Sequence, residues 1–441
     1  MFTKKELSRL IIPLLIEQVL AVTVGFADSL MVSGVGESAV SGVSLVDTVN
    51  VLLFGLFGAL ATGGAVVTSQ LLGQKNEKEA CKSGQQLLIS ILALSLLLMA
   101  ISLLFGKDLL LLLFGSVEAD VMEHSKIYLI YTAISFPFMA VYNACAALFR
   151  SMGNSRVSMI ISMIMNAINI SFNAILIYGA GWGVAGAAIA TLISRIFAAV
   201  TMYILLHDKK HSIHIEGYAQ FIPDFKLIKR ILKIGVPNGL ENSVFQIGKI
   251  LVQGIIAGLG TPAITANAIA STIGGIGVLP GSAIGLALIT VVGRCVGARD
   301  FDGVKKYTFK LMKLTHIIMA VINALLILAI PLILRMYKLS DETSQIARSL
   351  MTYHCVLSVL IWPLSFTLPN ALRAANDVRF TMYVSMASMW IWRIAFSYIL
   401  AIPFGLGVLG VWIAMTIDWL CRSICFVWRF VKGKYRELSL I

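Results

Sequence analysis

The chain has 441 residues, of which 58% are hydrophobic and only 13% are charged, whereas a soluble domain carries about 25% charged residues. A soluble protein could not bury this much apolar surface, and exposed apolar patches would make it aggregate, so the composition excludes a soluble globular protein. The net charge of +13 does not indicate a nucleic-acid partner. The basic residues lie in short runs between apolar stretches, where they orient helices in a bilayer.

Twelve apolar segments are long enough to cross a membrane as helices, which takes about 20 residues each. In chain order they are 9–33, 44–72, 84–105, 125–149, 157–178, 184–206, 231–257, 264–293, 310–334, 348–372, 380–402 and 408–431. A long polar stretch separates the sixth from the seventh. We therefore predict an all-α integral membrane protein with an N-terminal lobe (1–206), a cytoplasmic linker (207–230) and a C-terminal lobe (231–441), each lobe containing six helices.

The basic residues are distributed unequally over the two sides of the membrane. If the loops alternate between the sides, the side with both termini carries 27 of the 35 Lys and Arg residues and the other carries five. The remaining three, Arg195, Lys249 and Arg393, fall inside spans. Because Lys and Arg concentrate in cytoplasmic loops, we expect cytoplasmic termini and a multi-pass protein of the inner cell membrane.

The two halves of the chain repeat one another at a shift of 224 positions. Pro13 corresponds to Pro237, and the run that begins at Gly181 corresponds to the run that begins at Gly405. With an even number of helices per half, the lobes are expected to be related by a pseudo-twofold axis along the membrane normal. Two such lobes can open a cleft to either side of the membrane, which favours transport by alternating access over a static scaffold.

Several motifs are shared with a known family of transporters. They are the run GFADSLMVSG that begins at Gly25, the helix ends QLLG at Gly73 and RCVG at Gly297, and the paired segments 150–156 and 373–379. On these motifs the chain resembles the multidrug and toxic compound extrusion (MATE) family, most closely its DinF-like branch. The resemblance implies a multidrug efflux antiporter that exchanges Na⁺ or H⁺ for amphipathic, often cationic compounds.

Four polar residues of the N-terminal lobe are predicted to share one depth in the membrane. Counted from the outer loops at about 1.5 Å per residue, Asp28 and Asn173 lie about 9 Å deep, and Asn169 and Thr191 lie slightly deeper. Their oxygens suit a hard cation, so we expect a Na⁺ or proton site there. The DinF-like pattern matches Asp28, Asn169 and Thr191 and has an aspartate in place of Asn173. The alternative is that the asparagines only bond helix to helix.

Three acidic residues and one lysine within the spans are secondary candidates. Glu17 and Glu241 occupy equivalent positions in the repeat, which fits either paired roles or a shared helix contact. Other branches of the family place a glutamate at the position of Phe245, whereas the acid of this chain is Glu241. Asp47 is expected near the outer end of its span, in contact with water. Lys249 could act as a tethered cation that prevents ion binding in the C-terminal lobe.

A buried ion-pair network is predicted in the C-terminal lobe. Asp418, Arg393 and Lys249 lie at similar depths, so Asp418 is expected to pair with one of the two cations and to fix helix positions. No partner is predicted for Arg195.

Other classes of function fit the sequence less well. An enzyme is not indicated, since the chain has no HExxH, GxSxG or phosphate-binding motif, and we expect no cofactor besides the coupling ion. A flippase for lipid-linked precursors is the alternative transporter, because it shares the broad architecture. The expected partners are small amphipathic or cationic substrates and the lipid bilayer, not nucleic acid, and the expected state is a monomer.

Overall fold

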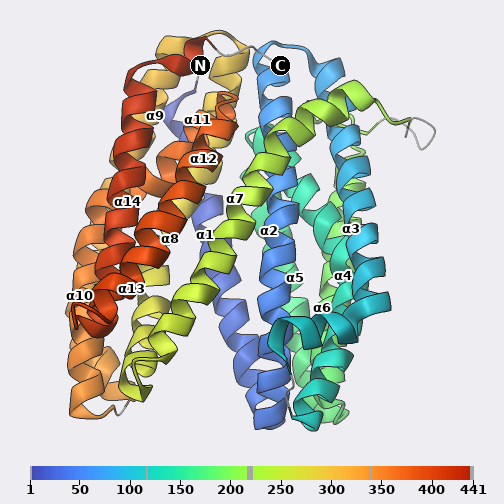
Figure 1. The fold of residues 1–441 in the computed structure, drawn as a ribbon. Coiled ribbons are helices and arrows are strands. Elements are labelled where there is room, and N and C mark those ends of the chain that lie inside the picture. The colour runs from blue at the N-terminus through green and yellow to red at the C-terminus, as the bar shows by residue number, and fades with distance from the viewer. Residues whose placement is uncertain (1, 116–117, 216–221, 338, 438–441) are drawn as a thin grey trace. The chain divides into compact units, whose positions relative to one another are not determined.

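The computed structural model describes residues 2–115, 118–215, 222–337 and 339–437. Figure 1 shows these residues as long helices joined by short turns. The first half contains α1 (Lys4–Ser33), α2 (Glu37–Gly73), α3 (Glu77–Phe114), α4 (Ala119–Ser151), α5 (Ser155–Asn173), which continues into the π-helical segment η1 (Ala174–Gly179), and α6 (Gly183–Leu205).

The second half begins with α7 (Phe225–Ala257), which is followed by α8 (Thr261–Gly297) and α9 (Phe301–Tyr337). Each of its next two helical segments is interrupted by a π-helical turn. The first segment consists of α10 (Asp341–Trp362), η3 (Pro363–Thr367) and α11 (Leu368–Ala374). The second consists of α12 (Val378–Ser388), η4 (Met389–Ala395) and α13 (Phe396–Ala401). The last long helix is α14 (Gly407–Val431), and a short 3₁₀ turn, η5 (Lys434–Arg436), follows it.

Each predicted span falls within one of these continuous helical segments, to within one residue at either end. Judged on the described residues, eleven of the segments are long and apolar enough to cross a membrane. The exception is α7, in which Asn242, Gln246 and Lys249 interrupt the apolar stretch.

Some of the helices begin where a side chain bonds the free amides of the first turn. Before α1, Thr3 accepts a hydrogen bond from the backbone of Glu6, and the carboxylate of Glu6 accepts one in return from the backbone of Thr3, which makes a capping box. Asn76 before α3 and Ser340 before α10 also accept bonds from backbone amides.

The backbone turns between helices repeat as the sequence does. Lys75 and Arg299, which are 224 positions apart, both adopt a left-handed conformation, with φ of 59° and 57°. Gly181 and Gly405 do the same, with φ of 72° and 68°. Residues other than glycine are uncommon in this conformation, so its occurrence at both Lys75 and Arg299 is informative. The internal repeat therefore extends from the sequence to the backbone conformation.

The chain forms two compact units, Phe2–Gly239 and Leu240–Ile441, which are called the N-lobe and the C-lobe below. The division between them falls inside α7, as does the predicted start of the C-terminal lobe at residue 231. Within the N-lobe, the first half of α7 packs directly on α2. A Cβ atom at Gly63 would lie 2.6 Å from the carbonyl oxygen of Ile231, so glycine at this position permits the close backbone contact that small residues give membrane helices.

Candidate functional site

Polar side chains form a connected cluster inside the N-lobe, where α1, α5 and α6 meet. Asp28 on α1 accepts a hydrogen bond of 2.6 Å from the side-chain amide of Asn173, the last residue of α5. The same amide lies 3.3 Å from Oδ1 of Asn169, whose own amide donates to the hydroxyl of Thr191 on α6 at 3.2 Å. The structure therefore brings together the four residues that the sequence analysis placed at one depth.

The side-chain oxygen of Asn173 is a hydrogen-bond acceptor without a donor in this cluster. It is buried and has no hydrogen-bond partner among the described residues. Leaving a buried polar atom unpaired costs free energy, and carboxylate and carbonyl oxygens are the ligands that hard cations prefer. The oxygens of Asp28, Asn173 and their neighbours therefore fit a Na⁺ ion, and the carboxylate alone can take a proton.

Two carboxylates share one arginine in this part of the N-lobe. Arg195 interacts electrostatically with Asp28 and with Asp47, of which Asp47 is exposed. The guanidinium group also donates to the hydroxyl of Ser135 at 2.6 Å and lies 4.7 Å from the centre of the Phe54 ring, so Arg195 has partners that the sequence did not reveal. Two carboxylates and one guanidinium leave one negative charge, which a single Na⁺ or proton neutralises.

An ion pair recurs at equivalent positions of the two halves. In the N-lobe, Glu17 lies 3.7 Å from Arg150 and accepts a hydrogen bond of 3.0 Å from Ser158. In the C-lobe, Glu241 accepts a hydrogen bond of 2.7 Å from Arg373. Each pair joins the first helix of its half to the arginine that precedes the turn after the fourth span. Contacts of this kind fit the interpretation of the two glutamates as helix-packing residues.

The C-lobe contains a second group of buried charges around Asp418. This carboxylate is fully buried and accepts a hydrogen bond of 2.5 Å from the hydroxyl of Ser388. Its Oδ2 lies 4.0 Å from Arg393 and 3.9 Å from Arg422. Lys249, the other cation considered as its partner, makes no ion pair within the described part of the chain.

Arg422 and the π-helical segments are features that the sequence analysis missed. Arg422 is 2% exposed and also lies 3.8 Å from Glu241, so it connects the two carboxylates of the C-lobe. The sequence did hold one sign of this role, because Arg422 lies one helical turn after Asp418. Because it also lies near the cytoplasmic end of the last span, the sequence analysis counted it among the basic residues of the cytoplasmic side. The segment η1 begins directly after Asn173, and η4 contains Arg393. Such π-helical turns occur frequently at functional sites.

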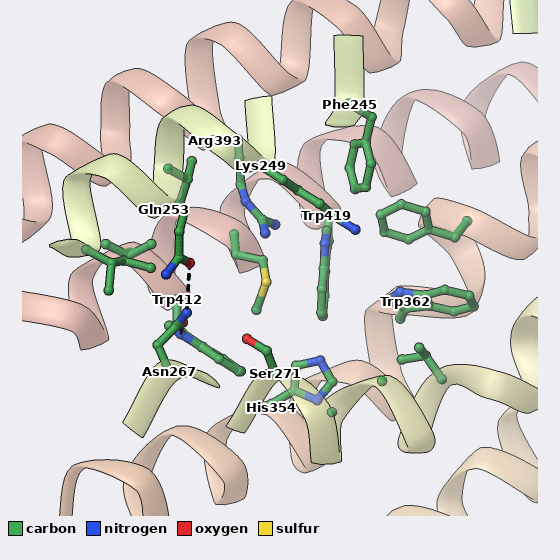
Figure 2. A pocket seen from close by; sticks show the side chains of 18 residues that line it. Phe245, Lys249, Gln253, Asn267, Ser271, His354, Trp362, Arg393, Trp412 and Trp419 are labelled. Atoms are coloured by element: carbon green, nitrogen blue, oxygen red, sulfur yellow. Dashed lines mark hydrogen bonds between the residues drawn. The ribbon is translucent and has the colours of Figure 1, made fainter. Parts of the chain in front are cut away.

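A cavity of about 430 Å³ lies within the C-lobe, between α7, α8, α10, η3, η4 and α14. Figure 2 shows Lys249 and Arg393 on one side of this cavity and Ser271 and His354 on the opposite side. Its aromatic walls are formed by five residues, Phe245, Trp362, Phe366, Trp412 and Trp419. The cavity therefore combines flat apolar surfaces with two basic side chains.

Comparisons with known sequences agree with this architecture. The sequence profile described as MatE matches residues 13–175 and 237–399, two ranges that are displaced by the 224 positions of the internal repeat. The chain is 27% identical to the uncharacterized transporter YisQ of Bacillus subtilis, over 93% of this chain and 90% of that protein. It is 25% identical to a probable multidrug resistance protein NorM of Thermotoga maritima, over 99% of this chain and 94% of the relative.

Solved structures share the fold. A structure described as MATE in the straight conformation has a TM-score of 0.91 at 22% identity and covers 99% of this chain and 97% of that one. A transporter of the MOP superfamily from Pyrococcus furiosus, described by the reverse polarity of its binding pocket, has a TM-score of 0.90 at 22% identity, with 99% and 97% coverage. MATE structures of this kind have twelve transmembrane helices in two lobes, and these relatives are transporters rather than enzymes. The chain therefore belongs to the MatE family and is a multi-pass membrane transporter of the multidrug and toxic compound extrusion type.

Proposed function

We propose that this chain is a secondary active antiporter that binds Na⁺ or H⁺ at the Asp28 cluster and exports amphipathic, cationic organic compounds in exchange. The observation that carries the proposal is the buried, unpaired side-chain oxygen of Asn173 beside the carboxylate of Asp28. One monovalent cation supplies the missing partner of this oxygen and also neutralises the one negative charge that remains after Arg195 is counted against the two carboxylates.

The geometry of the cluster links ion binding to helix position. Asp28 lies on α1, Asn173 at the end of α5 and Thr191 on α6, so an ion held by all three would tie three helices together. A ligand shifts a conformational equilibrium only by its different affinities for the two states. A site assembled from three helices provides that difference, because movement of α1 alone removes the carboxylate from the other ligands.

An apolar surface lies beside these charges. Phe54, Phe57 and Phe136 have ring centroids 6.0 to 6.2 Å apart. Phe57 and Phe136 are fully buried, and Phe54 is half-buried. Phe54 already carries the guanidinium of Arg195 over its ring, so a substrate would reach only the part of this ring that Arg195 leaves exposed. An aromatic face next to a net negative charge favours a flat cation. Such a substrate would compete with the coupling ion for the same carboxylates, which is the basis of exchange.

Transport in proteoliposomes tests this proposal. The purified protein is reconstituted, and accumulation of the cationic dye ethidium is followed under an imposed Na⁺ gradient or an imposed proton gradient. The gradient that drives accumulation identifies the coupling ion. The Asp28→Asn variant is expected to lose gradient-driven transport to the level of empty vesicles, because an amide holds neither a proton nor the charge of the site.

A matched control separates this loss from a general effect of removing a carboxylate. Glu37 is an exposed carboxylate in the first turn of α2, and Glu37→Gln is expected to transport at the parent rate. If Asp28→Asn protein concentrates the dye against its gradient as fast as the parent, Asp28 has no part in coupling.

Family membership favours efflux over the flippase alternative. We also propose that the chain acts as a monomer, since one chain contains both lobes. Light scattering on the purified protein, corrected for bound detergent, is expected to give the mass of one chain.

A further inference from the structure

We propose that the C-lobe cavity is a second ligand site, separate from the Asp28 cluster, and that it binds flat aromatic carboxylates. The proposal concerns binding in the C-lobe and goes beyond the cation-coupled export proposed above. It stands on the charge balance of this lobe, on the groups that face the cavity and on the shape of the cavity.

The buried charges of the C-lobe do not balance. Apart from the carboxylates at the helix ends, its described spans contain two acids, Glu241 and Asp418. Three cations, Arg373, Arg393 and Arg422, are buried or largely buried with them, and a fourth, Lys249, is exposed and lines the cavity. The lobe therefore carries two surplus positive charges at membrane depth. A charge away from water is unfavourable unless it is paired, so an anionic ligand would stabilise this arrangement.

The surplus cations are the two that reach the cavity. Lys249 makes no ion pair within the described residues, and its Nζ lies 4.9 Å from the centre of the Phe245 ring. Arg393 has only the contact of 4.0 Å with Asp418, and its buried Nε and Nη1 atoms have no hydrogen-bond partner in the part of the chain that the structure describes. Figure 2 shows both side chains pointing into the cavity. Their unused donors match the several lone pairs of a carboxylate.

The opposite wall offers polar groups without any competing acid. His354 is 7% exposed, and its Nδ1 also lacks a hydrogen-bond partner among the described residues. None of the 18 residues that line the cavity, all of them described, is an aspartate or a glutamate. A cationic ligand would meet two like charges in this cavity and no counter-charge, whereas an anion would meet two partners.

The aromatic walls indicate what else the ligand contains. Trp362 stacks on Phe366 with ring centroids 4.9 Å apart, and Trp419 meets Phe366 edge-on at 6.1 Å. The indole of Trp412 is fixed by a hydrogen bond of 2.9 Å to Asn267. A cavity of about 430 Å³ falls in the usual range for sites of small organic ligands, roughly 300 to 1,000 Å³. These flat surfaces favour a ligand of one or two aromatic rings over a simple inorganic anion.

Isothermal titration calorimetry on the purified full chain tests this inference. The probes are 2-naphthoate, the uncharged 2-naphthamide, the cationic 2-naphthylmethylammonium and inorganic phosphate. We expect 2-naphthoate to bind at least about tenfold more tightly than the amide, since hydrogen bonds to a charged group are worth more than neutral ones. Phosphate and the ammonium compound are expected to bind more weakly than the amide or not at all.

Substitutions then locate the bound anion. Lys249→Met is expected to weaken 2-naphthoate binding at least about tenfold while leaving affinity for the amide nearly unchanged. Because Lys249 is in no ion pair, this variant is expected to melt at the temperature of the parent or above it. Lys310→Met removes an exposed lysine from α9 and is expected to change neither quantity. Asp28→Asn is expected to bind 2-naphthoate as the parent does, which keeps this test independent of the coupling site.

Three outcomes would overturn the inference. Equal binding of 2-naphthoate and 2-naphthamide would show that charge is not recognised, and undiminished binding by Lys249→Met would place the anion elsewhere. Phosphate binding as tight as that of 2-naphthoate, and equally dependent on Lys249, would replace an aromatic carboxylate site by a simple anion site.

Discussion

Asp418 is the residue for which the structure gives the sharpest prediction of stability. Its carboxylate is fully buried and faces Arg393 at 4.0 Å and Arg422 at 3.9 Å. In Asp418→Asn, Arg422 keeps Glu241 at 3.8 Å, whereas Arg393 loses its only carboxylate within the described chain. One pair at this distance is worth about 4 kcal/mol at an effective dielectric constant of about 20, and breaking a buried pair typically costs about 3–5 kcal/mol. At about 2–4 °C per kcal/mol for a unit of this size, the melting temperature is expected to fall by about 6–20 °C.

Thermal melting in detergent with a thiol-reactive fluorogenic dye measures this change, because Cys145, Cys295 and Cys355 are buried and react only on unfolding. The double variant Arg393→Met with Asp418→Leu removes both charges and is expected to recover much of the loss. The control is Asp302→Asn, which removes an exposed carboxylate from a surface ion pair and is expected to have the melting temperature of the parent. An Asp418→Asn protein that melts at the parent temperature, or a double variant less stable than the single one, would refute the buried pair.

Three further predictions concern topology, packing and coupling. A cysteine at position 37, in place of Glu37, is expected to react with an impermeant maleimide on intact cells, whereas one in place of Lys210 is not; the reverse labelling pattern would contradict the orientation. Gly63→Ala is expected to lower the melting temperature because its Cβ meets backbone atoms at 2.6 and 2.9 Å, while Gly58→Ala in the same helix meets nothing within 4 Å and is the control. Asn173→Asp is expected to steepen the pH dependence of transport, because two adjacent carboxylates compete for one proton; a profile like that of the parent would show that they do not interact.

Much of the N-lobe cluster could be predicted by counting residues from the outer loops. Short turns such as the one at Gly181 hold neighbouring helix ends at one level, so residues at equal distances from them lie at equal depths. Counting along a helix gives depth but not direction around the helix axis. For this reason the sequence placed Asp418, Arg393 and Lys249 at one level, but it could not tell which of the two cations faces the carboxylate.

The remaining differences arise from contacts between distant segments. Arg150 and Arg373 were recognised as parts of a repeated motif, but their partners lie more than a hundred residues away in sequence. Arg422 was assigned to the cytoplasmic end from its position alone, whereas burial between two carboxylates makes it part of the interior. The pattern of charges along the sequence identifies the spans, but it does not show whether a charged residue at the end of a span is in water or is paired with an opposite charge inside the protein.

The π-helical segments give the two halves different windings. A π-helical turn holds about one residue more than an α-helical turn, so every side chain beyond it is rotated by about 100° relative to an uninterrupted helix. The segment η4 (Met389–Ala395) corresponds, at the shift of 224, to residues 165–171, which are regular α-helix within α5. The N-lobe segment has its own π-helical turn, η1 (Ala174–Gly179), but nearer its end. Between these two positions the segments therefore present different faces to the interiors of their lobes. Removing one residue from η4 would restore the regular winding, at the cost of changing the direction in which either Arg393 or the helix that follows it points.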